Sequence, residues 1–151
     1  MRHSEISLKP IDIDLRKPLP GRIRLYLYNA THPPGGRTLG EHKIQLIVPG
    51  QKPKQTGSFD HKGNRIVLLA GYQCELEVFI LWDSGLYPIF SYSRNVQVHP
   101  EVIYSAYAGN IGEQRRKIRG KGEEIVITSN AFNLCEAICK RIEYTINRIA
   151  Q

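Results

Sequence analysis

The sequence predicts an α+β fold, a mixed or antiparallel, partly barrel-like sheet of about six to seven strands with a C-terminal helix packed on it. Three observations predict this class. Short segments that alternate apolar and polar residues fill the chain as far as Val98. Helical spacing of apolar residues appears only after that point. Clusters of Pro and Gly separate the segments, and strands do not alternate with helices.

The first half of the chain predicts four strands. Residues 1–21 are partly irregular, and the alternation over 11–15 indicates a short edge strand there. Residues 22–28 alternate strictly, which predicts one buried face formed by Ile23, Leu25 and Leu27. A further alternating strand is expected over 41–48, and the nearly all-apolar segment 65–72 predicts a central strand.

Three more strand segments follow. Residues 75–82 alternate around a core face that ends at Trp82. Residues 87–98 indicate either one bent strand or two short ones. Residues 123–128 predict a last strand before the C-terminal helix.

Helices are expected only in the last third of the chain. Pro100 suits a first helical turn, and Gly109 ends that helix. Asn110 with Glu113 resembles a capping box and predicts a second short helix. Ser129 is expected to cap the final helix, 130–150. We expect its apolar stripe to lie on the sheet, formed by Cys135, Ile138, Cys139, Ile142, Ile146 and Ile149.

Composition limits the function classes. The chain has 151 residues, which suits a single domain over 1–151, and its formal net charge of +7 favours anionic partners. Without an apolar run of membrane-spanning length or an apolar signal segment, we expect a cytoplasmic protein with no membrane partner. The three cysteines lack the spacing of a disulfide framework or a zinc site, so we expect buried thiols and no cofactor.

Basic residues gather in segments with a loop-like composition. Lys and Arg on such segments neutralise DNA phosphates, and we expect them to lie together on one concave side. The alternative is a solvated basic face. The candidate phosphate contacts are Arg22, Arg24, Arg37, Lys52, Lys54, Arg94, Arg115, Arg116, Lys117, Arg119 and Lys121.

Other side chains suit contacts with bases. Asn and Gln pair with adenine through two hydrogen bonds, and Arg pairs with guanine. Tyr92 offers a ring for stacking. The candidate base-reading residues are Arg37, Gln45, Arg94, Asn95 and Gln97.

A catalytic alternative rests on Glu41 and Lys43. Because strand side chains alternate, both lie on one face, as do the acid and the lysine of Mg²⁺-dependent nucleases. A second metal-binding acid is expected on a preceding strand, but 22–28 contains none. An ion pair across strands explains the same pattern, so we expect no catalysis by the isolated domain and Mg²⁺ only under this alternative.

The segments YLYNATHPPGGRTLGEHKIQLIVPGQ, GNRIVLLAGY and VFILWDSGLYPIFSYSRNVQV resemble a known family over about residues 15–148. It is the methylase-associated domain of bacterial restriction–modification loci, found beside or fused to DNA methyltransferases and restriction enzymes. The resemblance implies a DNA-recognition or effector module of a restriction or antiviral defence system. The positions that carry the resemblance are Tyr28, Asn29, Pro34, Gly35, Gly36, Arg37, Lys43, Gln45, Gly50, Trp82, Asp83, Tyr92, Ser93, Asn95 and Gln97.

The leading hypothesis is a module that binds double-stranded DNA through loops 32–37 and 49–57 and the segment 113–121. The resemblance implies a modified base as a possible target, and a methyltransferase, nuclease or other restriction-system subunit or fused domain as a protein partner. A third hypothesis is a subunit-docking module whose basic face meets an acidic partner.

Overall fold

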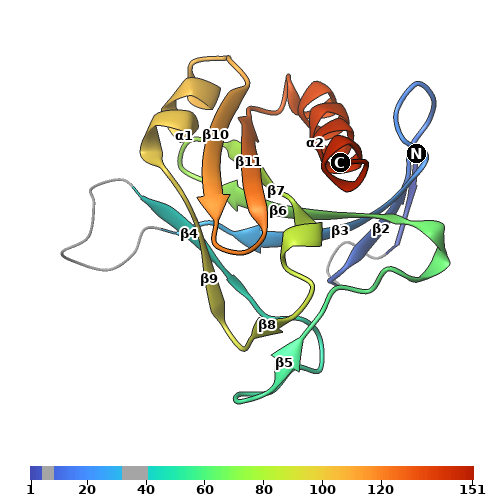
Figure 1. Cartoon of the computed structure of the whole chain (residues 1–151). Coiled ribbons are helices and arrows are strands. Elements are labelled where there is room, and N and C mark those ends of the chain that lie inside the picture. The colour runs from blue at the N-terminus through green and yellow to red at the C-terminus, as the bar shows by residue number, and fades with distance from the viewer. Residues whose placement is uncertain (5–8, 32–40) are drawn as a thin grey trace.

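The computed structural model of the chain describes residues 1–4, 9–31 and 41–151 (Figure 1). Its centre is a seven-stranded sheet in the order β1-β2-β3-β6-β7-β11-β10. The β3–β6 pair is parallel and the other neighbouring pairs are antiparallel, so the expected mixed sheet is confirmed, but it is open and does not close into a barrel. Its strands are β1 (Arg2–His3), β2 (Ile11–Asp14), β3 (Arg22–Asn29), β6 (Ile66–Gln73), β7 (Val78–Trp82), β10 (Gly112–Ile118) and β11 (Gly122–Ser129).

Two small antiparallel ribbons accompany the sheet. The first pairs β4 (His42–Leu46) with β9 (Arg94–Val98), and the second pairs β5 (Thr56–Gly57) with β8 (Phe90–Ser91). Residues 87–98 therefore contain two short strands. Single 3-10 turns, η1 (Lys62–Asn64) and η2 (Ser84–Leu86), stand in loops where the sequence predicted turns.

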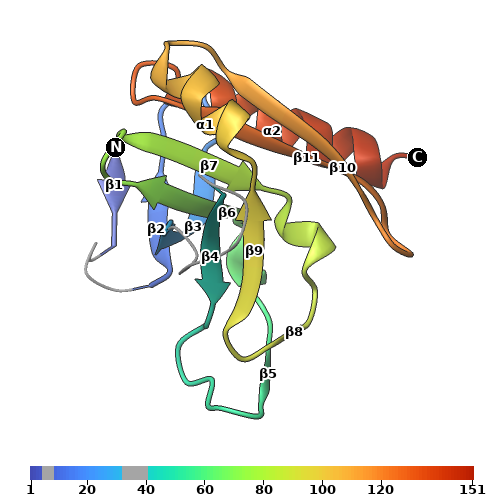
Figure 2. The same cartoon turned by 90° about the vertical axis from the view of Figure 1, so that its left-hand side faces the viewer.

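Two helices complete the fold. Helix α1 (Pro100–Tyr107) has the predicted bounds and proline start. Helix α2 (Leu134–Ile149) packs mainly on β7 and β11, which confirms the C-terminal helix on the sheet (Figure 2). The predicted Ser129 cap is wrong, because Ser129 still pairs with Phe79 in the sheet and the helix begins at Leu134. No helix in the described ranges is both long and apolar enough to cross a membrane.

Both faces of the sheet are covered. The larger core lies between one face, the β4–β9 ribbon and α1, and it includes Tyr26, Tyr28 and Trp82. The smaller core lies under α2 and takes in Leu25 and Leu27. The prediction of a single buried face on residues 22–28 is therefore wrong, because the ribbon covers the face that was expected to be exposed.

The predicted helix after Asn110 is also wrong. Residues 112–118 form β10, which pairs along its whole length with β11, from Gly112 opposite Thr128 to Ile118 opposite Gly122. A capping pattern is a local signal, and pairing with the strand that follows in a hairpin overrides it. This change places the basic segment on a strand and a tight hairpin.

The apolar stripe of α2 faces the sheet only in part, because Ile138 packs against the smaller core but other members do not. The buried residues of this helix are Ala137 and Arg141, whereas Ile146 and Ile149 are 60% and 68% exposed. All three cysteines are exposed, so the prediction that they are buried is wrong as well. Arg141 takes the central position because Asp83, at the end of β7, lies below it.

Candidate nucleic-acid interface

The outer face of the β4–β9 ribbon carries four polar side chains. In the antiparallel register Lys43 lies opposite Gln97, and Gln45 lies opposite Asn95. Strand alternation turns the residues between them inward, where each is at most 2% exposed. The inward residues are His42, Ile44, Leu46, Val96 and Val98. The ribbon therefore presents two polar cross-strand pairs on a buried face that is apolar apart from His42.

The ribbon is held firmly against the sheet. The main-chain carbonyl of Gln97 accepts hydrogen bonds from the indole of Trp82 and from Arg116, both at 3.2 Å. On the other strand, Lys43 and Thr31 exchange two backbone hydrogen bonds of 2.9 Å. These bonds fix the backbone behind the Lys43–Gln97 pair.

A basic groove of about 320 Å³ lies beside β9. It brings together the predicted site residues of two distant segments, because residues 112–118 form a strand from which Arg116 reaches the Gln97 carbonyl of β9. Among the described residues, no carboxylate lies within ion-pair distance of Arg94, Lys117 or Arg119. The groove is lined by Tyr87, Arg94, Asn95, Val96, Gln97, Arg116, Lys117, Ile118 and Arg119.

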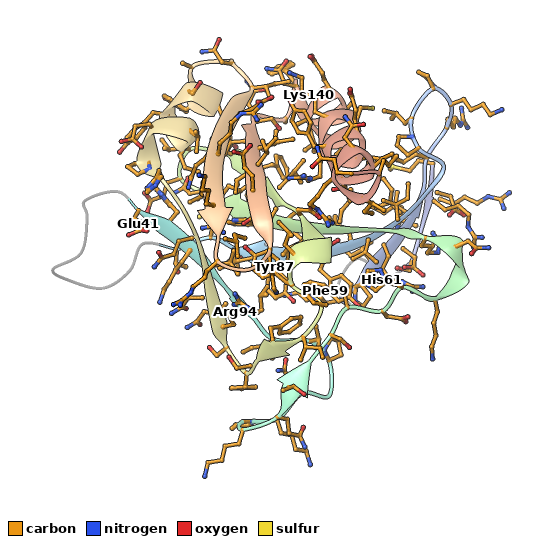
Figure 3. The ribbon with its side chains drawn as sticks, viewed as in Figure 1. Glu41, Phe59, His61, Tyr87, Arg94 and Lys140 are labelled. Carbon is orange, nitrogen blue, oxygen red and sulfur yellow. The ribbon has the colours of Figure 1, made fainter. Side chains whose placement is uncertain are left out.

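Arg116 differs from its neighbours because it forms the floor of this groove. Its guanidinium donates to Oε2 of Glu124 at 2.8 and 2.9 Å, and the Tyr87 hydroxyl donates to the same oxygen at 2.8 Å. Burial raises the pKa of Tyr87, and the charge of Glu124 adds to the effect. The Arg94 guanidinium lies 5.1 Å from the centre of the Tyr87 ring. Both residues are labelled in Figure 3.

Sequence reasoning missed Tyr87 and Glu124. The available signal was the alternation of β11, where Glu124 shares a fully buried face with Val126 and Thr128. An acid on such a face requires a buried cation, and the adjacent strand supplies Arg116 opposite Glu124.

A second cavity, of about 420 Å³, borders the ribbon on the side of β4. Its lining includes Gln45, Asn29 and Lys9. Of these, only Gln45 was predicted from the sequence as a contact with bases. The Lys9 ammonium lies 3.6 Å from the centre of the Tyr28 ring, and burial lowers its pKa. Arg37 and the loop 32–37 lie outside the described residues.

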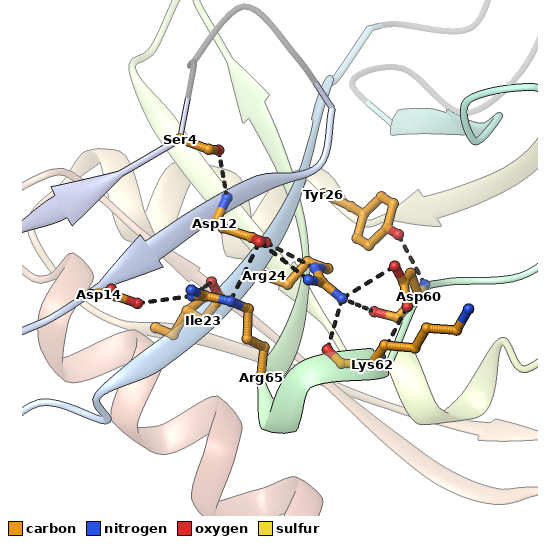
Figure 4. A network of polar contacts seen from close by, with 9 residues as sticks. All are labelled: Ser4, Asp12, Asp14, Ile23, Arg24, Tyr26, Asp60, Lys62 and Arg65. Carbon is orange, nitrogen blue, oxygen red and sulfur yellow. Dashed lines mark hydrogen bonds and ion pairs between the residues drawn. The ribbon is translucent and has the colours of Figure 1, made fainter.

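Arg22 and Arg24 lie at the start of β3, whereas Asn29 at the end of this strand borders the cavity beside the ribbon. Arg24 donates to Asp12 at 2.8 and 3.1 Å and pairs with Asp60 at 3.3 Å, in the network of Figure 4. It holds the pKa of Asp12 below the ordinary value through these hydrogen bonds. Arg65 joins Asp12 to Asp14 in the same network. This cluster fastens β2 to the sheet rather than lining the groove.

The remaining predicted cations lie outside the groove, in the loop after β4 and in the β10–β11 hairpin. Lys52 and Lys54 are exposed in the loop after β4. Arg115 pairs with Glu123 at 3.1 Å, and Lys121 donates to the Leu86 carbonyl at 2.8 Å in the β10–β11 hairpin. Tyr92 lies half-buried in the turn between β8 and β9. The structure therefore divides the predicted cations between a groove and separate ion pairs.

The nuclease hypothesis needs a second acid beside Glu41 and Lys43, but the aspartates of β2 and of the loops after β5 and β7 pair with arginines instead. Asp12, Asp14 and Asp60 belong to the arginine network at the start of β3, and Asp83 pairs with Arg148 under α2. Within the described parts of the chain, no group of three or more His, Cys, Asp or Glu is placed to hold a metal ion.

Comparison with known proteins gave one match. The sequence model of the family described as methylase-associated X1 matches residues 21–138. The matched range contains the β4–β9 ribbon, the basic groove and the first residues of α2. Neither a curated protein nor a solved structure matches the chain.

Proposed function

The chain belongs to the methylase-associated X1 family, and on that premise we propose that it is a DNA-recognition module whose β4–β9 ribbon reads double-stranded DNA. The family indicates a role in a restriction–modification system, in association with a methyltransferase or other components of that system. Binding to double-stranded DNA, and the residues that would contact it, are what we propose beyond this family role.

One observation carries the proposal: two polar pairs stand side by side on a rigid two-stranded ribbon. The major groove of B-DNA admits a two-stranded ribbon, and its base edges offer paired donors and acceptors. Gln45, Asn95 and Gln97 have the amide groups that pair with adenine, and Lys43 has a donor suited to guanine. A modified base in the target is a further element of this proposal.

The basic groove supplies contacts with the phosphates on one side of the ribbon. Arg94, Lys117 and Arg119 line it beside the base-reading pairs. Lys52 and Lys54, in the loop that follows β4, extend the positive charge along the same ribbon. Phosphate contacts hold a protein in register on the duplex, while contacts with base edges specify the sequence.

Duplex titration at several salt concentrations tests this function. Labelled random-sequence duplex should bind the wild-type chain with an affinity that falls as salt rises, because each neutralised phosphate releases counterions. The double variant Lys117→Ala/Arg119→Ala should bind all sequences more weakly. It should also reduce the slope of log K against log salt by about 2, one unit per lost contact.

Arg22→Ala is the matched control, since Arg22 is exposed at the far end of β3. It removes a positive charge without touching the groove, so the salt slope should stay within about half a unit of wild type. An affinity that does not depend on salt would contradict the proposal. So would a loss of affinity in the Arg22 variant as large, per charge removed, as the loss in the double variant.

A further inference from the structure

Helix α2 carries an apolar stripe that the fold leaves uncovered. From Cys135 to Ile149 its residues follow one another at intervals of four, three, four and three positions. This is the repeat of helices that pack against other helices. The preceding Phe132 continues the spacing and is 96% exposed. We call this stripe the α2 seam; it consists of Cys135, Cys139, Ile142, Ile146 and Ile149.

The seam lies beside the sheet rather than on it. Ala137 and Arg141 occupy the face of α2 that is buried against the sheet. A cavity of about 120 Å³ runs between α2 and β6, where Ile142 and Ile146 face Ile66 and Leu68. Because α2 packs mainly on β7 and β11, strands β6, β3 and β2 continue past it in the sheet. The seam and β6 thus form two apolar walls of one slot.

Charge borders the outer edge of this slot. Glu136 and Glu143 each follow a seam residue by one position, and both are exposed. These are the flanking positions whose charges select a partner in paired helices. Lys140 lies between the two glutamates on the same side of α2, but Glu113 of β10 already pairs with its ammonium at 3.7 Å. Figure 3 labels the position of Lys140 on the helix. On a chain of net charge +7, the seam therefore has an acidic border.

We propose that the slot between α2 and β6 binds an amphipathic helix of a partner protein, one whose apolar stripe is flanked by Lys or Arg. An apolar helix face in a groove is a common mode of protein recognition. A second copy of this chain fits less well, because antiparallel seams would bring Glu136 of one copy against Glu143 of the other. The slot is distinct from the DNA-reading ribbon and does not depend on it.

Two synthetic helical peptides test the proposal with the full chain. Both have about 18 residues with Ile and Leu at the seam-facing positions, one flanked by Lys and one by Glu. Fluorescence anisotropy should show the Lys-flanked peptide binding about tenfold more tightly at low salt. The net charge of the chain favours the opposite order, so this preference reports the local acidic border.

Variants locate the binding. Ile146→Lys should weaken binding of the Lys-flanked peptide about tenfold without changing thermal unfolding, because Ile146 is exposed in the free chain. Tyr107→Lys, a matched change at an exposed apolar residue of α1, should leave binding unchanged. In a Cys74→Ser background, saturating peptide should slow the reaction of the seam thiols with a thiol reagent about tenfold.

Three results would overturn the proposal. The first is absent or equal binding of the two peptides, and the second is unchanged binding by Ile146→Lys. The third is a dimer of the free chain, seen in analytical ultracentrifugation, that Ile146→Lys dissociates; this result would assign the slot to a second copy.

Discussion

Glu124 is the residue on which the basic groove depends. Its side chain is fully buried, and Arg116 and Tyr87 both donate to one of its oxygens. Arg116 is thereby neutralised and fixed, and it also holds the Gln97 carbonyl of the ribbon. One buried acid connects the sheet, the groove floor and strand β9 of the ribbon.

Glu124→Gln should lower the free energy of unfolding by about 3 kcal/mol, because it leaves the Arg116 charge largely buried without its counterion. Glu123→Gln is the matched control, since that neighbour is 49% exposed and its partner Arg115 is 57% exposed. An exposed pair of this kind contributes less than about 1 kcal/mol. Urea denaturation compares the two variants, and equal losses would contradict the role given to Glu124.

At the scale of elements, the ribbon lies on β6 at a glycine. A Cβ atom at Gly71 would stand 3.0 Å from Cγ2 of Ile44 on β4 and 3.0 Å from the Trp82 ring. This glycine has no side chain to separate the strands, so β4 approaches the sheet closely. The close packing holds the outer polar pairs in place.

Gly71→Ala should lower the free energy of unfolding by about 1–3 kcal/mol, the usual cost of an overpacked core. It should also weaken DNA binding by displacing β4. Gly21→Ala provides the control, because an added Cβ there meets no atom within 4 Å. Calorimetric melting of both variants tests this expectation, which fails if Gly71→Ala is as stable as Gly21→Ala.

Across the whole molecule, local alternation predicted most strands and the outward direction of Lys43 and Gln45. It did not predict that β9 pairs with β4, because the register of two strands far apart in sequence (Gln97 opposite Lys43, 54 positions away) depends on tertiary packing. The error over 112–118 has a different cause, because there the hairpin with the following strand β11 outweighed a capping signal.

Net charge predicted the sign of the surface but not its distribution. Arg24 and Arg116 fall into largely buried ion pairs, because a carboxylate lies opposite each of them on the neighbouring strand. Arg65, just before β6, pairs with Asp12 and Asp14 of β2. Arg94, Lys117 and Arg119 line the groove. The prediction that the whole apolar stripe of α2 faces the sheet was also wrong. Helical spacing identifies an apolar stripe, but it does not identify what covers that stripe.

The central claim is that the β4–β9 ribbon contacts the duplex, and NMR mapping of backbone amides during titration with DNA tests it most directly. Shifts should concentrate on Lys43, Gln45, Asn95 and Gln97, with weaker changes at Lys117 and Arg119. Shifts confined to α2 or to the β2–β3 arginine network, with the ribbon amides unchanged, would contradict the account.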